Sequence, residues 1–486
     1  MATYTRANRA EARDLEIRWP IELQLPQVLH ERMHVMRATH RLVLQFTLPT
    51  VVLSAIAIVS YLSVQTWHTR TIQRWIRTHS LRIAGLNPSL NVDDLEPLGA
   101  HLQDVQIIAL GEQSHGTHEF FLLKHRLLKY LVTRLGFRAF VLEASRARCR
   151  PINDYVLHGK GNLANVVHRQ GFFTWDTREM ADLIQWIHDY NRSVPDTQKV
   201  QFFGMDPQLP EIYAIEAYVK SAGTRDAEFA LKSLALVDTE IQDNPFLTHL
   251  TADRGVDLQK ASTNVETFLD KHREELLHRD VGQFNIIRED AHQLTEAIEA
   301  VRDPRLFFEK RDTYMAENVR DLLSQLGPRS KIVIWAHNYH VSSVRAPHSV
   351  LPMGELLRRW YGPAYFTVGF SFGIGAIRAK GSQDLKTPAI VMTTHPPDQR
   401  SIDDYLGGAC ADGCAFPYLL VLRKADDKAP HPVQEWLRST QSMRTIGAVY
   451  DPVHRQPVDT YHLVLIESFD CLAYVPQSSP SLPLSP

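Results

Sequence analysis

Carboxylate and imidazole side chains follow four short apolar runs of this 486-residue chain, close to the point where each run ends. They are Glu112 and His115 after the run 105–110, Glu143 after 138–142, Asp206 after 200–203, and His337 and His340 after 331–336. The carboxyl ends of parallel strands meet at one edge of an open sheet, which is where ligands bind. We therefore expect these side chains to lie together and form a catalytic site.

His115 is the predicted general base of that site. An imidazole titrates near neutral pH, so it can take a proton from water and later return it. Glu112 or Glu143 would orient the ring, and His337 and His340 complete the predicted catalytic set. The chain has no Gly-x-Ser-x-Gly elbow, and we find no convincing nucleophilic Ser or Cys at a strand end. Direct attack by water on an acyl or other electrophilic carbon is therefore favoured over a covalent acyl-enzyme.

The same residue types also suit a divalent metal ion. The candidate ligands are Glu112, His115, Glu143, His337 and His340. His337 and His340 are three residues apart, which suits two ligands on one turn, but the His-Glu-x-x-His motif is absent. The residues leave open whether the site needs no cofactor or a divalent metal.

Four further residues are candidate substrate-binding groups, namely Lys124, Asp206, Trp175 and Arg178. Lys124 follows His115 on an early helix, where it is either a cation for a developing oxyanion or a solvated helix charge. Trp175 and Arg178 either line the substrate cleft or belong to the core and a helix start. His125, on the same early helix, is expected to be a packing residue.

The pattern of elements predicts an α/β fold with a mostly parallel central sheet covered by helices, because nearly continuous apolar runs alternate with helical segments. Strands are expected at 105–110, 138–142, 200–203, 331–336, 366–370 and 418–422, with a last edge strand at 471–475. Strand signals vanish over about 209–325, which we interpret as a helical insertion in a domain of residues 101–480. The Ser/Pro-rich last ten residues are expected to be frayed.

Residues 42–67 contain no Asp, Glu, Lys or Arg over 26 positions, which predicts a single transmembrane anchor. It would follow a tail at 1–41 and precede a linker or helix at 68–100. Three arginines lie just before this run and four just after it, so the flanking charges do not set the orientation. Cys410 and Cys414 could close a small disulfide loop, which would place the main domain outside the cytoplasm, or stay reduced.

The composition excludes several classes of protein. Hydrophobic residues make up 44% of the chain and the net charge is -2, so a globular protein is expected and a basic nucleic-acid-binding domain is not. The four cysteines are too few for a disulfide framework. The expected partner is a small molecule, with membrane contact through residues 42–67.

The sequence resembles the erythromycin esterase family in an ordered set of motifs. They are Gly111-Glu112-x-x-His115-Gly116 with Glu119-Phe120; Leu142-Glu143-Ala144; Asn153-x-Tyr155; Trp186 with Tyr190-Asn191; Gly204-Met205-Asp206-x-Gln208; Arg311-Asp312-x-x-Met315-Ala316-Glu317-Asn318; Trp335-Ala336-His337-Asn338-x-His340-Val341; and Met353-Gly354.

The resemblance implies a parallel α/β core with a helical subdomain and hydrolysis of the lactone ester of macrolide antibiotics. His115 matches the family's general base, and Glu112, Glu143, His337 and His340 match the residues around it. Lys124 stands where some members carry Arg, so the cation is kept without its bidentate geometry. The alternatives are a metal-dependent hydrolase acting on another bond, and a membrane-anchored binding protein without turnover.

Overall fold

The computed structural model describes residues 27–247, 250–346, 349–382, 387–410, 416–423, 425, 428–453 and 459–484. Cys414 lies outside these residues, so the proposed pair with Cys410 stays a prediction. The chain divides into two compact units, Met1–Trp67 and His68–Pro486.

The first unit holds most of helix α1 (Gln27–His79). Between Thr50 and Trp67 its large apolar side chains are exposed, and those of Leu53, Ile58 and Leu62 are more than half exposed. The most apolar 18-residue window of the stretch Thr50–His79 has a mean hydropathy of 1.5, and among the described helices this one alone is long and apolar enough to cross a membrane. Signal sequences and the core helices of soluble proteins pass the same test of length and composition.

A mixed sheet forms the centre of the second unit, with the strand order β1-β8-β11-β6-β2-β5-β3-β4 and β7 paired to β6. Its strands are β1 (Ser80–Arg82), β2 (Ile107–Leu110), β3 (Ala139–Ser145), β4 (Gln201–Asp206), β5 (Ile332–Trp335), β6 (Tyr365–Ala379), β7 (Ile390–Thr393), β8 (Tyr418–Val421) and β11 (Cys471–Ser478). A separate antiparallel pair is formed by β9 (Thr440–Arg444) and β10 (Thr460–Val464).

The expectation of a mostly parallel sheet is wrong. Of the described pairings, the five from β11 to β4 are parallel, but β8 is antiparallel to both β1 and β11, and β7 is antiparallel to β6. The predicted edge strand 471–475 is also wrong in position, because β11 lies between β8 and β6. An apolar run indicates that a strand is buried on both faces. It does not indicate the direction of the strand or which strands lie beside it.

Alternate residues of each strand face two separate hydrophobic layers. Ile108 and Leu110 of β2 join one buried cluster, whereas Ile107 and Ala109 join the other. The first layer contains side chains of α3 (His118–Leu135), α4 (Arg146–His158), α5 (Leu163–Arg169) and α6 (Arg178–Ser193). The second contains the end of α1 together with α12 (Phe307–Leu326), α14 (Met353–Tyr361), α15 (Ile402–Ala409), α16 (His431–Arg438) and α17 (Leu465–Ser468). The sheet is therefore covered by helices on both faces.

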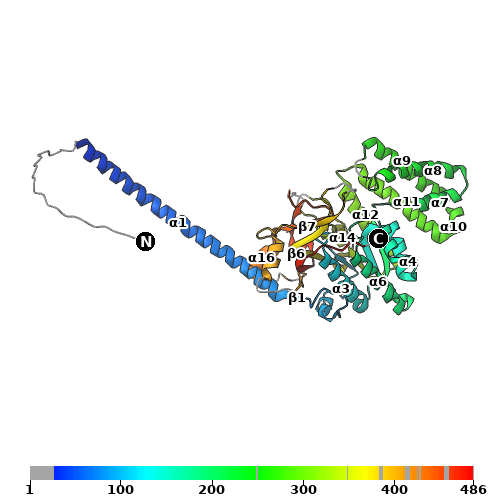
Figure 1. Ribbon diagram of the computed structural model, residues 1–486, viewed down its shortest axis with the longest axis horizontal. Coiled ribbons are helices and arrows are strands. Elements are labelled where there is room, and N and C mark those ends of the chain that lie inside the picture. The colour runs from blue at the N-terminus through cyan, green and yellow to red at the C-terminus, as the bar shows by residue number, and fades with distance from the viewer. Residues whose placement is uncertain are drawn as a thin grey trace, which may run out of the picture. The chain divides into compact units, whose positions relative to one another are not determined.

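The helices after β4 form a group with a core of its own (Figure 1). They are α7 (Tyr213–Ser221), α8 (Arg225–Asp243), α9 (Ala252–Lys271), α10 (Arg273–Arg279) and α11 (Val281–Arg302). The next helix, α12, belongs to the sheet layer, because Met315, Val319 and Leu322 pack in the second cluster. Sequence periodicity alone did not separate α12 from the insertion, since both are amphipathic.

Candidate active site

The loop after β2 carries Glu112 and His115 out of the centre of the sheet. Gly111 begins it, and a Cβ atom there would lie 2.2 Å from Oδ1 of Asn338 and 3.0 Å from the carbonyl of Val368. Only glycine lets the chain pass this close to the strand on either side. The amide of Asn338 donates to the carbonyl of Glu112 at 2.8 Å. The end of β5 therefore fixes the start of the loop.

Glu112 is a fully buried carboxylate that accepts three hydrogen bonds. Nδ1 of His115 donates to Oε1 at 2.5 Å, while Nζ of Lys124 and Nε1 of Trp335 each donate to Oε2 at 2.7 Å. A carboxylate can only accept here, so the proton of neutral His115 is on Nδ1 and the lone pair is on Nε2. No hydrogen bond joins Nε2 to any residue that the structure describes.

The ion pair of Glu112 with Lys124 is completely buried. Burial opposes ionisation of Glu112, but Lys124 and His115 outweigh it and lower the pKa of the carboxyl. Burial lowers the pKa of Lys124 to about 8 despite its pairing with Glu112. Nζ of Lys124 also lies 4.1 Å from the ring centre of Trp335, a cation–π contact. At neutral pH the site therefore holds a charged carboxylate behind His115.

A second ionic cluster surrounds Glu143 at the end of β3. Nη2 of Arg311 donates to Oε1 of Glu143 at 2.7 Å and to Oδ2 of Asp206 at 2.6 Å. The amide of His337 donates to Oε2 of Glu143 at 2.8 Å. Although burial opposes the charged form, His340 and Arg311 hold the pKa of Glu143 well below its usual range. Helix α12 thus supplies the cation that joins the ends of β3 and β4.

His337 and His340 differ in charge although they are three residues apart. The amide of Tyr339 donates to Nδ1 of His337, so the proton is on Nε2, 3.3 Å from the carbonyl of Gln113. Burial lowers the pKa of His337 to about 3, and the ring stays neutral. Burial acts the same way on His340, but Asp312 and Glu143 outweigh it and raise its pKa to about 9.

The charged His340 is held between carboxylates. Its Nδ1 donates to both oxygens of Asp312 at 2.8 and 2.9 Å, and Nε2 lies 3.2 Å from Oε1 of Glu143. Nη1 of Arg311 lies 3.0 Å from the same nitrogen. With His340 protonated, that approach joins two donors, and the neighbouring carboxylates compensate their repulsion.

The charges of the two clusters do not cancel. Four carboxylates face three cations, so one negative charge remains: the carboxylates are Glu112, Glu143, Asp206 and Asp312, and the cations are Lys124, Arg311 and His340. The ring of His115 lies 5.3 Å from that of His337, between the clusters. A proton taken up by His115 would neutralise the remaining charge.

The four predicted substrate-binding residues occupy different environments. Lys124 and Asp206 are fully buried, so Lys124 is not a solvated helix charge. Trp175 is also buried, donates Nε1–H to the carbonyl of Glu143 at 2.8 Å, and meets the ring of His115 edge-on at 5.4 Å. Arg178 is exposed at the start of α6. The structure thus brings Trp175, Lys124 and Asp206 to the site and leaves the side chain of Arg178 at the surface.

Comparison with known proteins matches residues 132–478 to the erythromycin esterase family model. The chain belongs to the erythromycin esterase family. An Escherichia coli protein of this family, erythromycin esterase type II, is 26% identical over 331 residues, which cover 62% of this chain and 76% of that protein. A Bacillus subtilis (strain 168) protein named "Putative hydrolase YbfO" is 25% identical over 372 residues, which cover 69% of this chain and 78% of that protein.

The fold agrees with a solved structure. A crystal structure of a Bacillus cereus protein superposes with a TM-score of 0.71 at 26% identity, covering 85% of this chain and 99% of that one. The matched family range contains Glu143, Arg311, His337 and His340 but begins after Glu112 and His115. The role of His115 therefore depends on the geometry of the loop after β2. Membership of the erythromycin esterase family and a hydrolase relative support a hydrolase.

Sequence reasoning left Arg311, Asp312 and Trp335 out of the site. Arg311 and Asp312 are adjacent charged residues in the middle of a helix whose neighbours Met315 and Ala316 are fully buried. That signal, an ionic pair on the apolar face of a helix, could have identified them. Trp335 ends an apolar strand, and nothing local distinguishes its indole N–H from that of a core residue.

The donor set does not fit a divalent metal ion. Glu112 is bound by Lys124, and Glu143 by Arg311, so an ion at either carboxylate would have to displace a cation. Among the described residues, no group of three or more His, Cys, Asp or Glu side chains could hold a metal ion.

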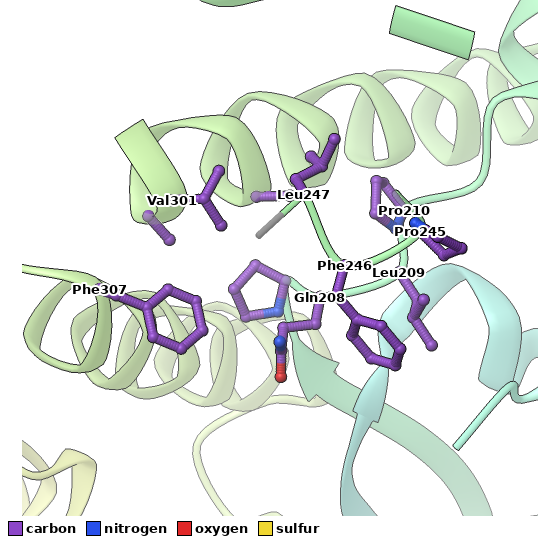
Figure 2. Close-up of a pocket in the computed structure, with 11 residues that line it drawn as sticks. Gln208, Leu209, Pro210, Pro245, Phe246, Leu247, Val301 and Phe307 are labelled. Atoms are coloured by element: carbon purple, nitrogen blue, oxygen red, sulfur yellow. The ribbon is translucent and has the colours of Figure 1, made fainter. Parts of the chain in front are cut away.

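A small apolar pocket lies at the seam between the end of β4 and the helical insertion (Figure 2). Pro207, Pro210, Pro245, Phe246 and Phe307 are among its lining residues. None of the lining side chains titrates, so the pocket is a packing defect or an apolar recess rather than the place of the chemistry.

His125 on α3 is a buried histidine whose protonation opposes folding. Burial lowers its pKa to about 3, and Nε2 is buried without a hydrogen-bond partner. The unfolded residue binds a proton below its ordinary pKa of 6.5, and the folded one does not until about pH 3. The unfolded state therefore takes up more protons between these values, so stability is lost as the pH falls from 6.5 towards 3.

As the pH falls from 6.5 to 4.5, His125 should lower the free energy of unfolding by about 2 kcal/mol. We expect His125→Leu to abolish this part of the loss. Urea unfolding of the detergent-solubilised full chain at both pH values measures it. His188→Asn, which replaces a histidine bonded to the carbonyl of Tyr155, is the control and should keep the original acid loss. An unchanged difference between the two pH values in His125→Leu would contradict the assignment.

Proposed function

We propose that this protein hydrolyses an ester or lactone bond with a water molecule activated by His115. One observation carries the proposal: the Nδ1–H of His115 donates to a buried, charged carboxylate, while Nε2 forms no hydrogen bond with any described residue. The side chain of His115 is 12% exposed, whereas those of Glu112 and Lys124 are completely buried. His115 is thus more accessible to a substrate from the solvent than Glu112 and Lys124 are.

The reaction follows from this arrangement. Nε2 takes a proton from water as the water oxygen attacks the carbonyl carbon, which gives a tetrahedral oxyanion. The carbon–oxygen bond to the alcohol then breaks, and the imidazolium returns its proton to the leaving oxygen. Glu112 stabilises the imidazolium, and the residual negative charge of the two clusters acts in the same direction.

We propose a role for Lys124 other than the binding of the oxyanion that the sequence suggested, and the same role for His340. Lys124 is bound to the buried Glu112, and His340 to the buried Asp312. We assign them to charge balance around Glu112 and Glu143, which keeps those carboxylates ionised. Asp206 acts similarly through Arg311.

A macrolide lactone is the proposed substrate because erythromycin esterases are among the relatives. The test incubates the full chain, purified in detergent, with erythromycin, with and without a chelator, and follows the mass of the antibiotic. Gain of one water in both arms supports the proposal. Gain only without chelator favours a metal-dependent hydrolase, and no gain with folded protein withdraws the macrolide, after which simpler esters and lactones are screened.

We also propose that α1 anchors the protein to a membrane. Two arginines in the middle of the apolar stretch, Ile58→Arg with Leu62→Arg, would cost about 2.5–3.5 kcal/mol each at the centre of a bilayer. We expect this variant to leave the membrane pellet, while Met36→Arg, on the same helix outside the apolar run, stays in it. Alkaline carbonate extraction of cell membranes measures both. Equal retention of the two variants would contradict an anchor.

A further inference from the structure

The segment Ser479–Leu484, which we term the strap, is bound to the two helix starts beside the catalytic loop. The sequence predicted that the last ten residues fray, and for Ser479–Leu484 this is wrong. The carbonyl of Ser479 accepts from the first amide of α3, that of His118, and the carbonyl of Leu482 accepts from the first amide of α6, that of Arg178, each at 2.9 Å. The strap thus satisfies an otherwise unpaired N–H at both helices.

The two attachments repeat the same chemistry. The amide of Ser479 donates to Glu119 at 2.7 Å, and that of Leu482 donates to Glu179 at 3.0 and 3.2 Å. Glu119 and Glu179 are each the second residue of their helix. A strap residue therefore gives its carbonyl to the first helical amide and its amide to the next carboxylate, once at α3 and once at α6.

A proline directly follows each of the two attached residues, Ser479 and Leu482. Pro480 pairs with Thr117 and Pro483 with Thr177 as antiparallel bridges, and each threonine directly precedes its helix. Proline has no N–H to leave unpaired, and its fixed φ favours an extended chain. The Ser-Pro composition that suggested fraying instead stiffens the strap.

The strap reaches the residue that follows His115. The amide of Ser481 donates to the carbonyl of Gly116 at 2.9 Å, and the amide of Arg378 on β6 donates to the same oxygen at 3.1 Å. A Cβ atom on Gly116 would lie 1.9 Å from the carbonyl of Arg378, so the loop is closely confined on that side. Gly116 is therefore held between β6 and the strap.

The geometry points to the strap as a positioning element for His115, a role that rests on the hydrolase function proposed above. Its attachments at Gly116 and His118 fix the backbone immediately after the base. Its attachment at Arg178 ties that loop to α6, three residues after Trp175, whose ring packs on His115. The strap touches neither Glu112 nor Lys124 in any described contact, so it acts on the alignment of His115 and not on the charge behind it.

The decisive variants change the strap in two ways. Ser481→Pro removes the N–H that binds Gly116, and Ser481→Ala keeps it. A chain ending at Ser478 removes every attachment and serves if proline distorts the strap. All three are made in the full chain and purified in detergent beside the unchanged protein.

The first readout is amide hydrogen exchange, which needs no substrate. We expect faster exchange in peptides that cover Gly116–Glu119 in Ser481→Pro, and also at the start of α6 in the shortened chain, with β3 and β5 unchanged. The second readout is steady-state hydrolysis of whichever ester the unchanged protein accepts. We expect kcat to fall about tenfold or more in Ser481→Pro with KM within about twofold, and Ser481→Ala to retain kcat.

The outcomes separate the two proposals. Unchanged exchange in both Ser481→Pro and the shortened chain overturns the strap's role, and so does faster exchange with unchanged kcat. If the unchanged protein hydrolyses no ester, the hydrolase proposal fails, and the exchange data alone decide whether the strap holds the loop. If kcat falls as far in Ser481→Ala as in Ser481→Pro, the lost N–H of Ser481 is not the cause. That result would overturn the role assigned to this N–H.

Discussion

Replacing His115 by alanine is expected to lower kcat by about 10³-fold or more without unfolding the protein, because general acid–base catalysis contributes about 10²–10⁴ to such reactions and no second base is free. The acceptor atoms of Glu143 and His337 are engaged by buried donors. His340 is protonated and donates to Asp312. The side chain of His115 is the most exposed of the cluster but only 12% exposed, so the folding of the variant is measured beside its activity.

The measurement is the rate of ester or lactone hydrolysis by the detergent-solubilised full chain, together with its circular dichroism and urea midpoint. His125→Leu is the matched control, because it removes another histidine ten residues further along on α3 and should retain kcat at pH 7. Turnover by His115→Ala within about tenfold of the unchanged protein would remove His115 from the role of base.

Replacing Arg311 by methionine is expected to destabilise the protein by about 3–5 kcal/mol, the usual cost of leaving a buried charge without its partner. Arg311 is 6% exposed and binds both Glu143 and Asp206, whose carboxylates face no other arginine or lysine within ion-pair distance among the described residues. Methionine keeps much of the volume, so the loss reports the charge more than the packing. Without Arg311, the carboxylates of Glu143 and Asp206 at the ends of β3 and β4 would repel each other.

Urea unfolding at pH 7 measures the loss. Arg305→Met, which removes an exposed arginine paired with Asp303, should leave the midpoint unchanged. The double variant Arg311→Met with Asp206→Asn should recover part of the stability, since one uncompensated carboxylate is gone. A midpoint for Arg311→Met equal to that of Arg305→Met would show that the cluster is not held by this ion pair.

The sequence by itself determined the buried strands β2 to β6, β8 and β11, although not β1, β7, β9 or β10, and it placed polar residues at the ends of four of them. Runs such as 331–336 are apolar on both faces, so they can be stable only inside a covered sheet. His115 and Glu112 are three residues apart on one short loop, and such a pair can meet without help from distant parts of the chain. The polar residues after four strands were expected at one edge of the sheet. This followed from the general rule that the carboxyl ends of parallel strands meet at one edge, where ligands bind.

Only the tertiary structure decided the partners that set each group's charge. Lys124 became the buried partner of Glu112, and Arg311 entered the site from a helix 168 residues after Glu143. Strand direction was equally undetermined, because the apolar run of β8 reads the same in either direction. The strap gives the clearest case: a Ser/Pro segment has no apolar pattern, and its order comes from carboxylates and helix starts more than 300 residues away. Local sequence specifies local conformation, whereas long-range hydrogen bonds and ion pairs exist only once the chain has folded.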